Sequence, residues 1–409
     1  MPGPDREQDA DRPAPGVAHP ASGDGRRPRL GLIVNPVAGV GGRVGLKGSD
    51  GAAVQRRALW AGAVPQASVR TIRALRRLAG VTGLEVLAAP GAMGADQAAA
   101  VGLSATAIAW SGTVPSSCAP GQGLPPTTAA DTRAAARELV RAGVDLLLFA
   151  GGDGTACDVH DVVGDRVPVL GIPTGVKMHS GVFASSPEAA GEATAAWLAD
   201  PSPDRLVDAD VADIDEVAVR EDRIATRLHG RVRVPRDRAR VLAAKGGTAR
   251  RVDAELDAAC ARTMDDVAPG TLVLVGPGTT AGRALRGLGL PSTLLGVDAV
   301  RDGEDVGRDL DERGLLALLD DAPSAVLLLG VVGGQGALLG RGNQQLSPAV
   351  LRRLGPGALR VVAGRDKLAA LSPGALRVDT GDAELDRRLS GHLPVRVSAR
   401  ETVVMAVAP

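Results

Sequence analysis

An apolar run that ends in a turn of glycines, an acid and a hydroxyl constrains the fold of this chain most strongly. Residues 145–150 read Asp-Leu-Leu-Leu-Phe-Ala, and Gly151-Gly152-Asp153-Gly154-Thr155 follows at once. A short apolar run without polar alternation, bounded by glycines, is typical of a strand that is buried on both faces. The stretch 129–142 before it has helical periodicity. The sequence therefore predicts an α/β fold with a parallel sheet covered by helices on both sides.

The same alternation extends through the first half of the chain. Further buried strands are predicted at 30–35, 84–89, 105–109 and 167–172, with Ala-rich helical stretches between them. Residues 1–28 combine proline, glycine and charge with few large apolar residues, which predicts a disordered tail. Segment 111–126, rich in glycine, proline and serine, is predicted to be a long loop. We expect an N-terminal α/β domain over residues 29–203.

The pattern changes after residue 204, where a second domain over 204–409 is predicted. Alternating segments at 206–211 and 231–234 indicate antiparallel β structure, and 250–264 has helical periodicity. Further β/α units are then expected, with strands at 271–275, 293–297, 325–331, 359–363 and 402–406. The second domain should therefore mix antiparallel β structure with β/α units.

Composition excludes several classes of partner. The formal net charge is +0 over 409 residues, so no overall field favours nucleic acid or an anionic membrane. The chain has no Tyr and only 2 Phe, too few for a platform that stacks bases. No apolar run approaches the ~18 residues of a membrane span. The 3 cysteines are far apart, which argues against disulfides and a Cys-based zinc site and favours the cytoplasm.

The turn after the strand at 145–150 has the chemistry of a phosphate site. Ligands of open α/β sheets bind beyond the carboxyl ends of the strands, and glycines there let backbone N–H groups approach phosphate oxygens. We assign Gly151, Gly152, Gly154 and Thr155 to nucleotide binding. Asp153 is the candidate catalytic residue, either activating an attacking hydroxyl or holding Mg²⁺ against the phosphates. The alternative is an ordinary glycine-rich turn with a solvated aspartate.

Four other glycine-rich segments follow predicted strands, and we expect them to contribute to the same site. The segment 35–51 matches neither the Walker A nor the Rossmann glycine spacing, but it carries a lysine that suits a phosphate. Arg341 could clamp a phosphate with two hydrogen bonds. The alternative for the segment 35–51 is a flexible surface loop. The alternative for His179 is a structural histidine, and for the two segments of the second half it is ordinary turn chemistry. The candidate nucleotide-binding residues in these segments are Asn35, Gly41, Gly42, Lys47, Gly175, Lys177, His179, Ser180, Gly278, Thr279, Thr280, Gly334, Gln335, Gly336, Arg341 and Asn343.

A further polar segment, Asp379-Thr-Gly-Asp382, permits two readings. It could form a metal or ribose site. Asp382 also directly precedes the helical stretch 383–389, where a carboxylate is a favourable N-cap. We favour the cap.

These motifs together resemble the ATP-NAD kinase family, and most closely its AcoX-like branch of polyphosphate- or ATP-dependent NAD kinases. The segments that carry the resemblance are 35–51, 151–158, 175–180, 333–348 and 379–391. The resemblance implies an N-terminal domain of the NAD kinase and diacylglycerol kinase type. It also implies phosphoryl transfer from ATP or polyphosphate, with Mg²⁺, to the 2′-hydroxyl of NAD. Asp153 would activate that hydroxyl, and the chain would form a homo-oligomer.

One departure from the family pattern keeps other functions open. The Asn-Glu pair with which typical NAD kinases hold NAD is absent, since neither asparagine is followed by glutamate. The acceptor could therefore be another small alcohol or a lipid, although the neutral, aromatic-poor chain gives no cue for a membrane surface. A non-catalytic nucleotide-binding regulator linked to acetoin catabolism is the third alternative.

Overall fold

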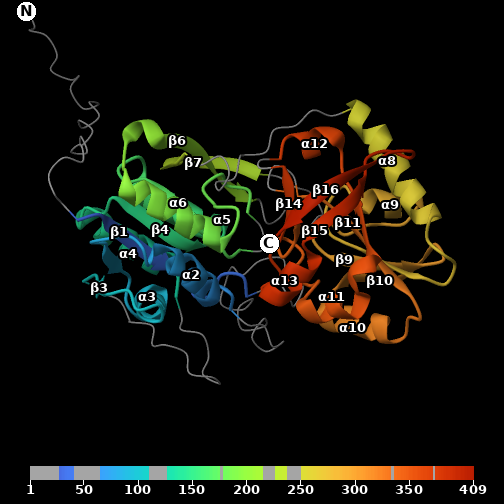
Figure 1. The fold of residues 1–409 in the computed structure, drawn as a ribbon, viewed down its shortest axis with the longest axis horizontal. Helices are drawn as coiled ribbons and strands as arrows, with labels where there is room; N and C mark the ends of the chain where they lie inside the picture. Colours follow the sequence, from blue (N-terminus) through green and yellow to red (C-terminus); the bar gives the residue numbers. More distant parts are fainter. Residues whose placement is uncertain are drawn as a thin grey trace, which may run out of the picture.

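Two lobes, each built around its own β-sheet, lie side by side in the computed structural model (Figure 1). The structure describes residues 27–40, 65–109, 127–175, 178–214, 226–236, 250–332, 336–371 and 374–409. The N-terminal lobe, blue to green in Figure 1, contains a five-stranded sheet. The C-terminal lobe, yellow to red, contains a nine-stranded sheet. The predicted α/β fold with a second domain containing β structure and β/α units is confirmed.

The sheet of the N-terminal lobe is entirely parallel, in the order β3-β2-β1-β4-β5. Its strands are β1 (Arg29–Val34), β2 (Glu85–Ala88), β3 (Ala105–Ala107), β4 (Leu146–Gly151) and β5 (Val169–Pro173). Its helices are α2 (Ala67–Leu75), α3 (Ala95–Ala99), α4 (Ala129–Arg141), α5 (Asp153–Val163) and α6 (Pro187–Ala199), with 3₁₀ turns at Arg76–Leu78, Gly91–Met93 and Pro203–Arg205. The strands predicted in this half are confirmed, and their ends lie within two residues of the predicted ones.

The apolar sequence of β4 is explained by the helices on both faces of the sheet. Leu147 and Phe149 belong to a core cluster with residues of α4 and α5. Leu146 and Leu148 belong to a second cluster with residues of α2 and α6. Successive side chains of a strand point to opposite faces, so a strand covered on both sides must be apolar at every position.

A long hairpin follows α6 and packs against the N-terminal lobe. Its strands β6 (Leu206–Ile214) and β7 (Thr226–Pro235) pair antiparallel, as predicted for this segment. Val211, Val232 and Val234 lie in the same core cluster as Phe149. The hairpin therefore adds to the core of the N-terminal lobe. The domain boundary expected at residues 203 and 204 stays a prediction.

The sheet of the C-terminal lobe is mixed, in the order β10-β9-β8-β11-β13-β15-β16-β14-β12. Its strands are β8 (Leu272–Val275), β9 (Val297–Arg301), β10 (Glu304–Leu310), β11 (Ala325–Gly330), β12 (Ala337–Leu339), β13 (Leu359–Val362), β14 (Ala375–Val378), β15 (Gly391–Arg396) and β16 (Thr402–Ala408). Its helices are α8 (Arg250–Asp265), α9 (Gly282–Gly287), α10 (Glu312–Asp320), α11 (Pro348–Leu354), α12 (Arg365–Ala369) and α13 (Ala383–Leu389), with a 3₁₀ turn at Pro356–Ala358. The pairs β9–β10, β8–β9 and β15–β16 are antiparallel.

One predicted strand in this lobe is misplaced. We expected a strand at 293–297, but β9 begins only at Val297. The carboxylate of Asp298 accepts hydrogen bonds from both the backbone N and the Oγ1 of Thr293, each at 2.7 Å. These bonds hold the preceding residues in a turn. Strands β10, β12, β14 and β15 were not predicted, because they are short, polar or interrupted by glycine and proline.

Several expectations fall on residues outside the described ranges. They concern most of the tail at 1–28, most of the loop at 36–51 and all of the loop at 111–126. Among the residues that the structure does describe, every helix is too short or too polar to cross a bilayer.

Candidate functional site

The glycine-rich turn after β4 opens helix α5. Gly152 is the N-cap of that helix and Asp153 is its first residue. Gly151 must be glycine, because a Cβ there would lie 2.4 Å from Cβ of Thr155. The N-terminus of a helix offers N–H groups without intrahelical partners and a positive dipole end, which together suit an anion. Gly154, on the exposed side of this turn, leaves the backbone accessible.

Asp153 is buried, and its carboxylate binds the segment that follows β5. It accepts hydrogen bonds from the backbone N of His179 at 2.7 Å, the backbone N of Ser180 at 3.0 Å and Oγ of Ser180 at 2.6 Å. Nδ1 of His179 lies 3.4 Å from the same carboxylate. Asp153, the acid that the sequence identified as the candidate catalytic residue, therefore also fixes the path of residues 178–180.

Ser180 extends this network to the hairpin. Its Oγ accepts a hydrogen bond from the backbone N of Ala212 on β6 at 3.0 Å. Asn35, at the end of β1, donates from Nδ2 to Oγ1 of Thr155 at 3.0 Å and accepts from the backbone N of Val37 at 3.2 Å. The turn after β4 is therefore bonded to the segments that follow β1 and β5, as expected for the carboxyl edge of a parallel sheet.

The only two phenylalanines of the chain support the segment after β5. The rings of Phe149 and Phe183 meet edge to face, with centroids 5.6 Å apart. Gly171 on β5 lies against the second ring, because a Cβ there would come within 2.4 Å of it. The backbone N–H groups of Thr174 and Gly175 donate to the carbonyl of Gly151 at 3.1 and 3.2 Å. The carboxyl ends of β4 and β5 are thereby held together.

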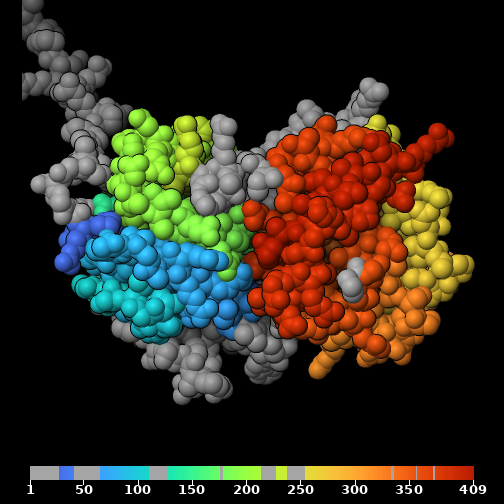
Figure 2. Space-filling view, viewed as in Figure 1, coloured from blue at the N-terminus to red at the C-terminus, as the bar shows by residue number. Residues whose placement is uncertain are grey.

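A pocket lies where the two lobes meet, and both lobes contribute to its walls. The N-terminal lobe supplies residues that follow β1 and β5 and one face of α2, and the C-terminal lobe supplies residues that follow β12 and β14. Figure 2 shows that the lobes abut along this boundary. The lining residues are Gly39, Val40, Gln66, Arg70, Pro173, Thr174, Gly175, Met178, Gly340, Arg341, Gln344, Leu346, Ser347, Pro348, Asp379, Thr380 and Gly381.

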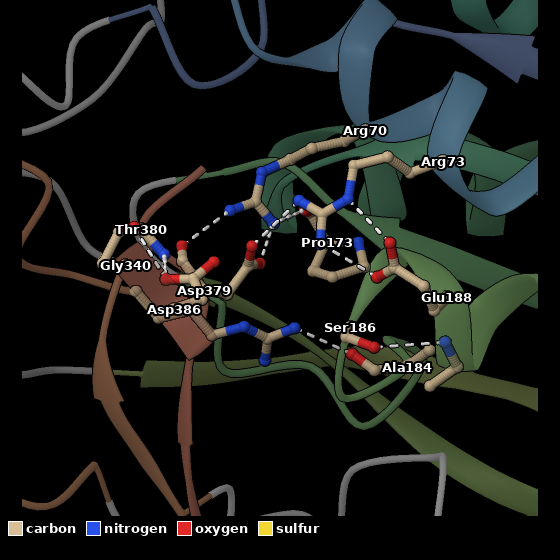
Figure 3. A network of polar contacts seen from close by, with 12 residues as sticks. Arg70, Arg73, Pro173, Ala184, Ser186, Glu188, Gly340, Asp379, Thr380 and Asp386 are labelled. Carbon is tan, nitrogen blue, oxygen red and sulfur yellow. Dashed lines mark hydrogen bonds and ion pairs between the residues drawn. The ribbon is translucent and has the colours of Figure 1, made fainter. Parts of the chain in front are cut away.

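A network of arginines and acids joins the lobes at this pocket (Figure 3). Arg70 on α2 forms an ion pair with Asp379 at 2.6 Å and donates to the carbonyl of Pro173 at 3.0 Å. Arg73, one turn further along α2, contacts the other oxygen of Asp379 at 3.0 Å. It also donates to both carboxylate oxygens of Glu188, at 2.7 and 2.9 Å. The two arginines therefore bind the C-terminal lobe through one aspartate.

The third arginine comes from the C-terminal lobe. Arg341 is buried and donates to the carbonyl of Ala184 at 2.8 Å. Burial, together with the nearby charge of Arg70, lowers the pKa of Arg341 to about 9, so it stays protonated at neutral pH. Among the charged residues that line the pocket, the two guanidinium groups of Arg70 and Arg341 face the single carboxylate of Asp379, which leaves an excess of one positive charge. Such a site favours an anion in surroundings of low dielectric constant.

Electrostatics explain why Asp379 stays ionised in this position. Burial by itself would raise the pKa of Asp379, but the charges of Arg70 and Arg73 outweigh it and hold that pKa below its usual value. For Arg73, burial would lower the pKa, but its bonds to Glu188 and Asp379 raise it. The next acid, Asp386, accepts from the backbone N and Oγ1 of Thr380 at 2.9 and 2.7 Å, and burial raises its pKa.

The turn that carries Arg341 approaches Asp379 very closely. Gly340 has φ +87°, and a Cβ there would lie 1.8 Å from the carbonyl oxygen of Asp379. Asn343 braces the turn, because its Oδ1 accepts from the backbone N of Gly340 at 2.9 Å and its Nδ2 donates to the carbonyl of Leu338 at 2.9 Å. Asn343 is thus engaged with the backbone of its own turn.

The structure brings only some of the predicted residues to the pocket. Gly175 and Arg341 line it, whereas Asp153, Thr155 and Asn35 are not among its lining residues and belong to the hydrogen-bonded network described above. Gly336 precedes β12 with φ +65°. The predicted residues that lie outside the described ranges are Gly41, Gly42, Lys47, Lys177, Gly334 and Gln335.

Gly278, Thr279 and Thr280 lie elsewhere in the C-terminal lobe. They follow β8, which is separated from β14 by β11, β13, β15 and β16 in the sheet order. Their contacts are local: the backbone N of Gly278 donates to the carbonyl of Leu294 at 2.8 Å, and the carbonyl of Thr280 faces Sγ of Cys260 at 3.4 Å. These residues are not among those that line the pocket between the lobes.

Sequence reasoning missed the arginines of α2 and their partner Glu188. Arg70 and Arg73 are three positions apart on a helix, which places them on one face, but an arginine pair on a helix is usually solvated. The aspartates around the turn at 379–382 carried a better signal. There, Asp382 is the N-cap predicted for α13, accepting from the backbone N of Leu385 at 2.9 Å, while Asp379 joins the network between the lobes.

Comparisons with known proteins match both lobes. The family model described as the ATP-NAD kinase N-terminal domain matches residues 30–201. The model described as the ATP-NAD kinase C-terminal domain matches residues 270–407. No curated protein matches the chain. The two matched regions contribute the opposite walls of the pocket.

Proposed function

The chain belongs to the ATP-NAD kinase family, and on that premise we propose that it transfers a phosphoryl group from ATP or polyphosphate to the 2′-hydroxyl of NAD, giving NADP. The observation that carries the proposal is the pocket between the lobes, where Arg70 and Arg341 provide an excess of positive charge beside the carboxyl ends of β1 and β5. Phosphoryl transfer depends mainly on positioning and on stabilising the charge of the phosphates.

The arginines and the backbone amides have distinct parts in this proposal. Arg341 and Arg70 hold phosphate oxygens of the dinucleotide, because planar guanidinium groups bind such oxygens with paired hydrogen bonds. The amides after β5, around Gly175, and the N-terminus of α5 hold the donor phosphates. Lys47 and Lys177, which lie outside the described residues, stay sequence-based candidates for phosphate binding.

Asp153 is proposed to activate the attacking hydroxyl. A carboxylate has about four positions for accepting hydrogen bonds, and the backbone and hydroxyl donors of His179 and Ser180 occupy three of them. One position is left for a substrate hydroxyl, with the orientation of the carboxylate fixed by the other three. Asp153 is not among the residues that line the pocket, but Met178, next to its partners His179 and Ser180, is.

Mg²⁺ is the proposed metal, bound together with the phosphoryl donor. The carboxylate of Asp379 is committed to two arginines, so it is a poor ligand. Mg²⁺ usually keeps several waters and takes its remaining ligands from one or two carboxylates and substrate phosphates. The one remaining position of Asp153 is assigned to the substrate hydroxyl, so the ion would be held mainly by the donor phosphates and water. When bound, the ion would neutralise charge on the phosphates during transfer.

The proposal is tested with the purified full-length chain, NAD, Mg²⁺ and either ATP or polyphosphate, with NADP as the measured product. Asp153→Asn should lower turnover by at least about 100-fold, because it removes the charge that activates the hydroxyl. Arg341→Met should mainly raise the KM for NAD. A well-folded wild-type protein that forms no NADP with either donor would refute the proposed reaction.

One observation favours a second candidate, a nucleotide-binding regulator without turnover. The carboxylate of Asp153 is buried and engaged in hydrogen bonds, and Asp153 is not among the residues that line the pocket. If it never reaches substrate, the arginine network would still bind nucleotides. Tight binding of NAD or ATP by calorimetry, without phosphate transfer to NAD or other alcohols, would support this function, as would placement in the AcoX-like branch linked to acetoin catabolism.

A further inference from the structure

Two histidines and an aspartate meet on the N-terminal lobe at a place that the proposed kinase site does not use. His160 and Asp161 lie on α5, and His229 lies on β7 of the hairpin. Nε2 of His229 is 2.7 Å from Oδ1 of Asp161, and Nδ1 of His160 is 3.5 Å from that oxygen. One ligand atom from each of the three residues lies within 4.8 Å of the others.

We propose that His160, Asp161 and His229 bind a divalent transition-metal ion of the zinc type. Two imidazole nitrogens and a carboxylate oxygen suit zinc and its neighbours, whereas Mg²⁺ and Ca²⁺ prefer oxygen ligands alone. Ligands about 2.1 Å from a tetrahedral ion lie about 3.4 Å apart, so small rotations of the side chains bring the three atoms into place. All three side chains are partly exposed, which leaves water as the fourth ligand.

The backbone of β7 is shaped so that His229 faces α5. In the pairing of β6 with β7, Val211 opposes Gly230 and Ala212 opposes Leu228, so His229 is an extra residue in a β-bulge. A bulge redirects a side chain that strict alternation would point to the other face. Here both His229 and Gly230 contact residues of α5.

Gly230 makes room for the second imidazole. A Cβ at Gly230 would lie 2.1 Å from Nε2 of His160. The rings of His160 and His229 meet edge to face, with centroids 5.1 Å apart. The bulge thus directs His229 of the hairpin toward Asp161, and the glycine leaves room for His160 of α5 beside the same carboxylate.

The charges around the cluster also suit a cation. Hydrogen bonds from His229, and to a smaller extent from His160, lower the pKa of Asp161, so it is ionised at neutral pH. Asp158, an acid that interacts electrostatically with Asp161, forms an ion pair with Arg133 that balances its charge. With neutral imidazoles the cluster carries a single negative charge. A bound ion would fasten the hairpin to the helix that begins with Asp153.

The test uses the full-length protein, stripped of metal with a chelator and then titrated with Zn²⁺ by calorimetry. Co²⁺ serves as a second probe, since its visible absorption reports coordination by protein ligands. We expect one site per chain, with affinity lowered about tenfold or more in His160→Ala, His229→Ala and Asp161→Asn. His392→Ala, which removes an exposed histidine on β15, should bind Zn²⁺ as the wild type does.

Gly230→Ala provides a sharper variant, because it keeps all three ligands but displaces the ring of His160. It should also weaken Zn²⁺ binding, and Zn²⁺ should raise the Tm of the wild type more than that of any of these variants. Unchanged Zn²⁺ affinity in both His160→Ala and His229→Ala, or no Zn²⁺ binding by the wild type, would overturn the proposal. Asparagine has nearly the same shape as aspartate, so Asp161→Asn should fold. It therefore tests the site even if a histidine variant does not fold. None of these measurements depends on kinase activity.

Discussion

Nη1 of Arg70 lies 2.6 Å from Oδ2 of Asp379, and this ion pair joins residues 309 positions apart in the chain. Arg70 is on α2 of the N-terminal lobe and Asp379 follows β14 of the C-terminal lobe. The two side chains are about nine-tenths buried (10% and 9% exposed). This pair, with Arg73, fixes the relative position of the two lobes at the edge of the pocket.

Removing one partner of this pair should destabilise the protein strongly. Asp379→Ala leaves the buried guanidinium group of Arg70 without its acid and Arg73 with Glu188 alone, a change that costs about 3–5 kcal/mol of unfolding free energy. Urea denaturation followed by circular dichroism measures the effect. The exposed pair Arg353–Asp320, at 3.1 Å, is the matched control, and Asp320→Ala should cost less than about 1 kcal/mol. Equal losses in the two variants would contradict the structural role assigned to Asp379.

The stability that Asp379 contributes should depend on pH in one direction. Its pKa is lowered in the folded protein, so the contribution is complete above the unfolded value of about 3.9 and is lost as the pH falls through the folded value. The difference in unfolding free energy between wild type and Asp379→Asn should therefore be constant from pH 7 to about pH 5 and shrink below about pH 4. A difference that already disappears at neutral pH would show that Asp379 is not held ionised by the arginines.

The turn at Gly340 should tolerate no side chain. Gly340→Ala combines a positive φ with a Cβ only 1.8 Å from the carbonyl oxygen of Asp379, so we expect a loss of at least about 3 kcal/mol. Gly355→Ala is the control, because Gly355 has a similar φ of +78° but no atom within 4 Å of the added Cβ. Its cost should be limited to the backbone term of about 1–2 kcal/mol. Thermal melts of both variants measure the two losses of stability. A larger loss in Gly340→Ala than in Gly355→Ala shows the steric contribution of the added Cβ.

Ser180 is expected to position Asp153 for the proposed reaction. Ser180→Ala removes the hydroxyl 2.6 Å from the carboxylate, which should lower kcat about tenfold, within the range for loss of an orienting group, and leave the KM for NAD nearly unchanged. Thr263→Val, which removes a buried hydroxyl on α8, controls for the loss of a buried hydrogen bond of about 1 kcal/mol. If both variants keep wild-type kcat, Ser180 has a structural role only.

Much of the N-terminal lobe could be predicted from sequence. The run at 145–150 has the composition of a strand covered on both faces, and its two core clusters explain that composition residue by residue. The C-terminal lobe was harder, because strands such as β10 and β15 are polar or contain proline and are defined by their pairing partners. Local composition does not record which distant strand will supply hydrogen bonds.

The sequence by itself determined the α/β alternation, the turn from Gly151 to Thr155 and the N-cap at Asp382, because each depends on residues that are neighbours along the chain. Only the tertiary structure decided that Arg70, Arg341 and Asp379 share one pocket, that Asp153 is not among its lining residues, and that His160 meets His229. These relationships join residues from different elements, and their free energies depend on burial and on partners that local patterns do not specify. The glycine-rich turn was therefore predictable, and its electrostatic surroundings were not.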